Sequence, residues 1–168
     1  MWEESLRMPF LARYPRSFPA GATSDAIVND ADFAPTILEM AGVPKPDFMQ
    51  GRSFAPILKG QPPPSDWPTA TYYRYWMHLA HHDNPAHYGI RTKEYKLIYV
   101  HGLPLDAEGA VPSPTEPYWE LYDLVKDPRE MNNLYGDPAL ADVTLRLKGE
   151  LKRLCASVGD VDDERVRP

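Results

Sequence analysis

Four histidines lie close together in the sequence and are the first residues whose types could support chemistry. They are His78, His81, His82 and His87, and Asp83 lies among them. Histidine and carboxylate side chains are good ligands for transition metals. The residues have no regular ligand spacing, however, and they fall in a segment without clear periodicity. A metal site and a polar loop with one histidine facing a substrate both stay open, and the irregular spacing favours the loop.

His87, Gly89 and Arg91 alternate along the chain. If this segment is a strand, all three lie on one face, and the glycine leaves space between the two polar side chains. His87 and Arg91 are therefore the candidate substrate-binding residues, suited to hydroxyl or anionic groups. The alternative for Arg91 is a structural ion pair within the fold.

The other reactive residue types give ordinary structural interpretations. Cys155 is the only cysteine, so no intrachain disulfide can form, and its place in a leucine-rich helical pattern favours a buried thiol over a nucleophile. No catalytic residue and no metal ligand is assigned. The remaining carboxylates are expected at the surface or a helix end (Glu3, Glu4) or in turns and caps (Asp123, Asp127, Glu130). The aromatic residues Tyr72, Tyr75 and Trp76 could stack on a ligand ring, but such a row of aromatic residues is more often core.

Short strands and two helices must position these residues. Strand-like runs occupy residues 8–14, 71–76, 88–92, 95–99 and 119–124, and residues 26–28 are a strand or an extended segment. A hairpin is expected around residues 93–94. A helix over about 30–41 would start at a cap formed by Asn29 and Asp30, with Pro35 in its first turn. Its apolar face would comprise Phe33, Ile37, Leu38 and Ala41.

A second helix is expected over residues 140–154, and residues 54–58 fit one short helical turn. Prolines account for 19 of the 168 residues, against an average usage of about 5%. The chain should therefore be rich in loops, and the proline run at 62–64 is the best candidate for a linker. A small antiparallel sheet with one packed helix predicts an α+β fold.

Composition excludes some partners. The net charge of −6 gives no basic footprint for nucleic acid. No stretch approaches the roughly 20 apolar residues of a membrane span. Residues 1–5 lack the basic and apolar regions of a signal peptide, and a strand-like run follows within ten residues. We expect Met1 to be an internal methionine of a longer protein, and the localisation is left open.

Three stretches, in this order, resemble the sulfatase family. They are Met1-Trp2-Glu3-Glu4-Ser5-Leu6-Arg7-Met8-Pro9-Phe10; Asn29 to Leu38 continuing through Gly42 to Gln50-Gly51-Arg52-Ser53; and Tyr88-Gly89-Ile90-Arg91-Thr92 with Tyr95-Lys96-Leu97, Glu120 to Leu124, Asp127-Pro128 and Glu130 to Leu134. Within this family, the sequence most resembles sugar sulfatases such as N-sulfoglucosamine or N-acetylglucosamine-6-sulfate hydrolases.

The resemblance implies an alkaline-phosphatase-like fold. Residues 1–65 would finish its large α/β domain, residues 66–158 would form a small domain with a four-stranded antiparallel sheet and a C-terminal helix, and residues 159–168 would be a frayed tail. Family enzymes use a formylglycine made within a Cys/Ser-x-Pro-x-Arg motif and a calcium ion. Cys155 is followed by no such motif, so the resemblance implies that neither group is bound here.

The implied function is that of a C-terminal fragment of a sulfuric ester hydrolase acting on sulfated carbohydrate or aryl sulfate. Its partners would be the missing N-terminal sulfatase domain and, in the complete enzyme, a sulfated sugar. Alone, the chain is expected to be inactive. The alternative is a standalone noncatalytic module, derived from a sulfatase, that binds carbohydrate or another protein.

Overall fold

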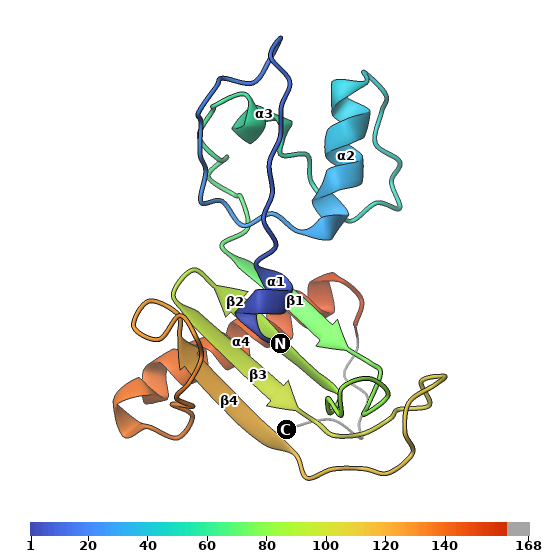
Figure 1. Ribbon diagram of the computed structural model, residues 1–168, viewed down its shortest axis with the longest axis vertical. Helices are drawn as coiled ribbons and strands as arrows, with labels where there is room; N and C mark the ends of the chain where they lie inside the picture. Colours follow the sequence, from blue (N-terminus) through green and yellow to red (C-terminus); the bar gives the residue numbers. More distant parts are fainter. Residues whose placement is uncertain (161–168) are drawn as a thin grey trace. The chain divides into compact units, whose positions relative to one another are not determined.

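The computed structural model describes residues 1–160 and divides the chain into two compact units (Figure 1). The sheet unit contains Met1–Met8 and the chain from Ala70 onward, and the helical unit contains Pro9–Thr69. The boundary expected after residue 65 stays a prediction. The expected frayed tail at 159–168 lies, from residue 161, outside the described residues.

Four antiparallel strands form the sheet in the order β1-β2-β3-β4. They are β1 (Ala70–Tyr75), β2 (His87–Thr92), β3 (Tyr95–Val100) and β4 (Tyr118–Asp123). All four were predicted, and so was the hairpin between β2 and β3. Thr92 stabilises that hairpin, because its Oγ1 accepts hydrogen bonds from the backbone N–H groups of Glu94 and Tyr95 at 3.3 and 2.9 Å.

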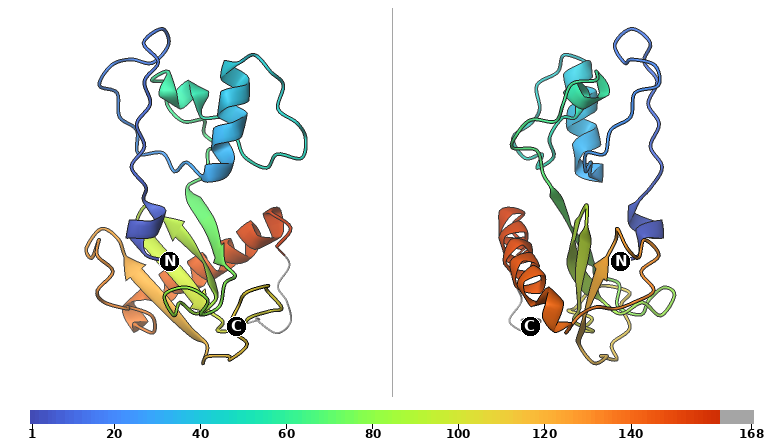
Figure 2. Two further views of the ribbon diagram at one scale, coloured as in Figure 1. Left: turned by 45° about the vertical axis from the view of Figure 1, so that its right-hand side comes forward. Right: turned by 90° about the vertical axis from the view of Figure 1, so that its left-hand side faces the viewer.

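Helix α4 (Ala141–Ser157) covers one face of the sheet, after a short 3-10 helix, η1 (Pro138–Leu140) (Figure 2). The predicted helix at 140–154 is thereby confirmed, as is the buried position of Cys155. Removing this apolar surface from water is the main favourable contribution to the packing. The buried core on this side comprises Ala70, Tyr88, Ile90, Leu97, Tyr99, Leu121, Leu147, Leu151 and Cys155.

The opposite face of the sheet is covered by the first residues of the chain. Helix α1 (Glu3–Leu6) lies on the side of the sheet away from α4, as the right-hand view of Figure 2 shows. A second buried cluster forms there from Met1, Ile98, Val100 and Tyr122. Both faces of the sheet are therefore covered, and side chains alternate between two cores along each strand.

The free edge of β4 is closed by a side chain. Asn133 accepts a hydrogen bond from the Leu121 N–H at 3.0 Å and donates one to the Trp119 carbonyl at 3.1 Å. The Leu134 N–H then donates to the Leu121 carbonyl at 2.8 Å. The Asn-Leu pair thus satisfies backbone groups that an exposed edge strand leaves unpaired.

The helical unit is organised around helix α2 (Asp30–Met40), with a short helix α3 (Ala55–Leu58). Asn29 and Asp32 form a capping box, in which the Asn29 N–H donates to Asp32 Oδ2 at 2.8 Å. Asp32 Oδ1 also accepts from the Arg52 N–H at 2.8 Å. Thr36 Oγ1, one turn along the helix, accepts from the Phe54 N–H at 3.0 Å. The predicted helix is confirmed. Through Asp32 and Thr36 it also holds the segment of residues 52–54 by hydrogen bonds.

Two expectations for the first 41 residues were wrong. Residues 8–14 form no strand, and no strand within residues 1–160 pairs with them. Residues 26–28 also form no strand, which leaves the alternative of an extended segment. An isolated strand leaves its backbone groups unpaired, so apolar composition alone does not produce one. Leu11 is 97% exposed. Pro35 lies in the second helical turn, not the first.

The apolar face of α2 also differs from the prediction. Ile37 is 64% exposed, and the buried positions are Asp32, Pro35 and Thr36. The inward face is set by the hydrogen bonds of Asp32 and Thr36 rather than by hydrophobic periodicity alone. Sequence periodicity cannot detect a polar face that is buried because it is hydrogen-bonded.

Gly51 permits the close approach of this distant segment to α2. A Cβ atom at Gly51 would lie 1.8 Å from the Ala31 carbonyl oxygen, which is far inside van der Waals contact. Proline at position 35 lacks the N–H that would normally bond this carbonyl. The helix therefore tolerates a close neighbour there only if that neighbour has no side chain.

Gly51→Ala is expected to destabilise the helical unit by about 3 kcal/mol, because the backbone must move to remove the clash. Gly149→Ala is the matched control, since a Cβ there would meet nothing within 4 Å. As an interior helical glycine, Gly149 should gain about 0.5–1 kcal/mol on substitution. Urea unfolding measures both changes, and equal effects would contradict the steric explanation.

Candidate functional site

His87, Gly89 and Arg91 share one face of β2, as predicted, and this face is the one covered by α1. The space above Gly89 is filled by the Met1 side chain, whose sulfur would be 3.1 Å from an added Cβ. The two polar side chains flank this contact. Both predicted residues are therefore in contact with residues 1–3.

A buried ionic network lies beside them, centred on Lys96. The Lys96 side chain has no exposed surface, and its Nζ lies 2.8 Å from the Met1 carbonyl oxygen and 3.0 Å from Glu3 Oε1. It also forms an ion pair with Glu130. The Glu3 N–H donates to Glu130 Oε2 at 2.8 Å. A charge at this depth is tolerated because it is paired and hydrogen-bonded.

Arg91 completes the network by binding Glu3 in a fork-like arrangement, with Nε and Nη2 at 3.3 and 2.9 Å from its two carboxylate oxygens. Burial by itself raises the pKa of the Glu3 carboxyl group, but hydrogen bonds from Arg91 and Lys96 outweigh it and lower the pKa. Two cations thus balance two carboxylates, Glu3 and Glu130. Glu3 begins α1 and Glu130 closes a turn on Asp127, as expected for a helix end and a turn, but both side chains are buried in this network. Asp123 and Asp127 bind turn N–H groups, as expected.

Sequence reasoning missed Lys96, although a signal was present. Lys96 interrupts an apolar strand at a position that shares a face with Ile98 and Val100. A charged residue on the buried face of a strand implies buried charged partners. Those partners are remote in the sequence, at positions 3 and 130, and a local pattern cannot identify them.

His87 is held rigidly at the other end of this face. Its side chain is 5% exposed, Nδ1 lies 2.7 Å from the Pro85 carbonyl oxygen and Nε2 lies 3.1 Å from the Met1 nitrogen. The ring stacks on Tyr75 with centroids 5.3 Å apart. Burial lowers the pKa of His87 to about 4, so the imidazole is neutral at neutral pH.

His87 lines a small polar hollow of about 40 Å³, which is the candidate site. Asn84, Tyr118 and Glu120 supply its other polar side chains, and burial raises the pKa of Glu120. The volume has room for one or two water molecules or a single small polar group. A neutral imidazole beside a carboxylate and an amide can exchange hydrogen bonds with a hydroxyl group. The arrangement is thus suited to binding, and it holds no nucleophile.

The other histidines do not converge. His78 is buried and joins two loops, accepting from the Ala86 N–H at 3.0 Å through Nδ1 while Nε2 lies 2.9 Å from the Ser113 carbonyl oxygen. His81 and His82 are exposed. No group of three or more histidine, cysteine, aspartate or glutamate side chains in residues 1–160 is placed to hold a metal ion.

The aromatic residues Tyr72, Tyr75 and Trp76 do not all belong to the hydrophobic core. Tyr72 packs at the edge of the core beneath α4, as predicted. Trp76 is instead 46% exposed and lies against the Arg74 guanidinium group, 3.8 Å from its ring centroid. The core interpretation was therefore wrong for Trp76.

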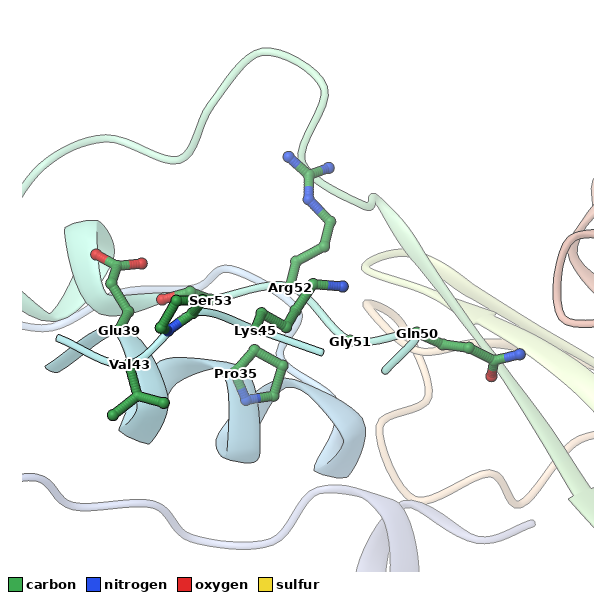
Figure 3. Close-up of a pocket in the computed structure, with 9 residues that line it drawn as sticks. Pro35, Glu39, Val43, Lys45, Gln50, Gly51, Arg52 and Ser53 are labelled. Carbon is green, nitrogen blue, oxygen red and sulfur yellow. The ribbon is translucent and has the colours of Figure 1, made fainter. Parts of the chain in front are cut away.

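A larger hollow of about 520 Å³ lies in the helical unit beside the C-terminal half of α2 (Figure 3). Figure 3 shows that the polar ends of Glu39, Gln50 and Arg52 point in different directions. Arg52 is bound by the Asp66 carboxylate, and Lys45 donates to the Met49 carbonyl. Without convergent polar groups, this hollow is a weaker candidate for a binding site.

The buried neutral His87 makes stability dependent on pH. The pKa falls from an ordinary 6.5 to about 4 on folding, so the unfolded chain binds a proton between these values and the folded chain does not. Stability should be full above pH 6.5 and fall by about 3 kcal/mol as the pH drops to 4. Urea unfolding at several pH values should show a smaller loss in His87→Gln than in wild type. The same slope in His87→Gln would contradict this, and exposed His82→Gln serves as the control.

Comparison with known proteins gives concordant matches. A family model described as N-sulphoglucosamine sulphohydrolase, C-terminal, matches residues 1–157. An N-acetylglucosamine-6-O-sulfatase of Bacteroides thetaiotaomicron is 44% identical over 137 residues, covering 81% of this chain and 22% of that protein. An ulvan-active sulfatase of Formosa agariphila is 30% identical over 179 residues, covering 96% and 35%.

Comparison with solved structures also finds sulfatases and related hydrolases. The structure of BT4656 in complex with its substrate D-glucosamine-2-N,6-O-disulfate is similar with a TM-score of 0.79 and 39% identity, over 89% of this chain and 28% of that chain. A phosphonate monoester hydrolase of Agrobacterium radiobacter, at 23% identity and a TM-score of 0.62, shares the fold over 83% of this chain and 27% of its own. The chain spans 22% and 35% of the length of the two sulfatases above. By the match over residues 1–157, it belongs to the N-sulphoglucosamine sulphohydrolase C-terminal family and corresponds to the C-terminal part of a sulfatase.

Proposed function

We propose that this chain forms the C-terminal part of a sulfuric ester hydrolase that removes sulfate from carbohydrate. The observation that carries the proposal is the family match over residues 1–157. The relatives named above act on or bind sulfated sugars by their names, namely N-acetylglucosamine 6-sulfate, ulvan and a disulfated glucosamine. The chain would complete the fold and line part of the substrate cleft, and a missing N-terminal domain would supply the rest.

Within this function, His87 is proposed to contact the sugar at the hollow that it shares with Glu120 and Asn84. A neutral imidazole suits a hydroxyl group, because it can donate or accept without carrying charge. Arg91 is proposed as the second contact. It uses Nε and Nη2 on Glu3, and among residues 1–160 no partner is found for Nη1, so a donor suited to carboxylate or sulfate remains.

The reaction centre is proposed to lie outside this chain. Calcium and formylglycine are the groups expected in the complete enzyme. Residues 1–160 contain no group of three or more side chains placed for a metal, and the thiol of Cys155 is 5% exposed in an apolar core. The described residues therefore do not fit either group. None of the helices over the same residues is long and apolar enough to cross a membrane.

Sulfate release tests the proposal. The 168-residue chain and a protein extended upstream in the source genome would be assayed with calcium on N-acetylglucosamine 6-sulfate and an aryl sulfate. Activity is expected only in the extended protein. His87→Ala in that protein should raise KM about tenfold, which corresponds to one lost hydrogen bond of about 1.4 kcal/mol, whereas exposed His82→Ala should not.

Two outcomes would contradict the proposal. Activity in the short chain would mean that a nucleophile lies within it. An upstream region without an in-frame Cys/Ser-x-Pro-x-Arg motif, together with an inactive extended protein, would favour the noncatalytic carbohydrate-binding or interaction module instead.

A further inference from the structure

Helix α4 is basic in an otherwise acidic chain. The helix buries Leu147, Leu151 and Cys155 against the sheet. Its charged residues are four cations and two carboxylates, so the helix has a net charge of +2, whereas the whole chain has a net charge of −6. These residues are Arg146, Lys148, Lys152, Arg153, Asp142 and Glu150. Cations are thus concentrated on one element of the sheet unit.

Lys148 is fixed in place beside two aromatic rings. Its Nζ donates to the Tyr135 hydroxyl group at 2.8 Å and lies 4.1 Å from the ring centroid of Trp119. The rings of Trp119 and Tyr135 are stacked, with centroids 5.8 Å apart and an interplanar angle of 14°. Tyr135 is 37% exposed. An ammonium group and an aromatic surface are therefore presented together in a preorganised arrangement.

One further cation extends this surface along the helix. Lys152 follows Lys148 by four residues, so the two lie on the same side of the helix about 6 Å apart along its axis. Lys152 is exposed and forms no ion pair with any residue from 1 to 160. Arg146 and Arg153 lie on the other side of the helix, about 140–160° around its axis from Lys148.

A solvated basic face is the simpler interpretation, but it leaves the aromatic pair unexplained. Solvated lysines are flexible and carry large rotamer entropy, whereas Lys148 is held by a hydroxyl group and two rings. A ligand that has both anionic groups and a partly apolar ring would use both features. Sulfated sugars have this combination, because each ring has apolar C–H surface and carries sulfate groups.

We propose that Tyr135, Lys148 and Lys152 form a binding surface for sulfated oligosaccharide. A sugar ring would pack on the exposed part of Tyr135, and its sulfate groups would pair with Lys148 and Lys152. The choice of a sulfated ligand rests on the proposed function, but binding at this surface requires no hydrolysis. The surface would hold a polymeric substrate by a contact additional to that at His87.

Isothermal titration of the 168-residue chain with heparin oligosaccharides at increasing salt tests this inference. Wild type should bind, with an affinity that falls as salt rises. Lys152→Glu should weaken binding at least fivefold and make the salt dependence shallower. The matched control is Lys126→Glu, which reverses one charge on a side chain that is 83% exposed elsewhere in the sheet unit. Its effect should be less than twofold.

Two variants of Tyr135 separate the ring from its hydroxyl group. Tyr135→Ala should lose about tenfold in affinity and Tyr135→Phe less than threefold, because only the first removes the stacking surface. Circular dichroism would confirm that each variant is folded. The inference is overturned if wild type does not bind, if Lys126→Glu and Lys152→Glu have equal effects, or if an unsulfated carboxylated polysaccharide binds as well. Since no sulfate release is measured, these failures are distinguishable from failure of the proposed hydrolase function.

Discussion

The sheet unit depends on a lysine that is completely buried. Taking the Lys96 ammonium group out of water costs several kcal/mol, and this cost is offset only where opposite charges and hydrogen bonds are in place. Glu3, Glu130 and the Met1 carbonyl oxygen supply these contacts. They come from the start of the chain and from the segment after β4. The requirement to neutralise one side chain on β3 thereby fixes two remote segments against the sheet.

The candidate site is a consequence of this arrangement. Residues 1–3 are held by Lys96 and Arg91, and Met1 in turn covers Gly89 and contacts His87. This contact helps to bury the imidazole beside Glu120, and burial keeps it neutral, whereas the Pro85 carbonyl fixes its orientation. A change in the ionic network should therefore alter the position of His87, although the two do not share a charge. α4, on the opposite face, contributes to the core and presents its own basic surface.

The elements that could be predicted are those with local causes. The four strands, their hairpin and α4 follow from residue periodicity over six to seventeen residues. The start of α2 follows from Asn29, although the second capping residue is Asp32 and not the predicted Asp30. The predictions were wrong where contacts with residues distant in the sequence determine the local structure. Residues 8–14 have strand composition but no partner strand within residues 1–160, and Ile37 lies outward because Thr36 binds the Phe54 N–H. For the same reason Glu3 and Glu130, which are 127 positions apart, could not be recognised as one site.

A double-mutant cycle between Lys96 and Glu130 tests the central role of this network most directly. Urea unfolding of Lys96→Met, Glu130→Gln and the double variant would give the coupling free energy. Each single change should destabilise the protein by about 3–5 kcal/mol, because it leaves a buried charge without its partner, and the double variant should lose at least about 2 kcal/mol less than the sum. Lys126→Met, at an exposed position, should change stability by less than about 0.5 kcal/mol. Additive effects, or a loss in Lys96→Met no larger than in Lys126→Met, would contradict the account.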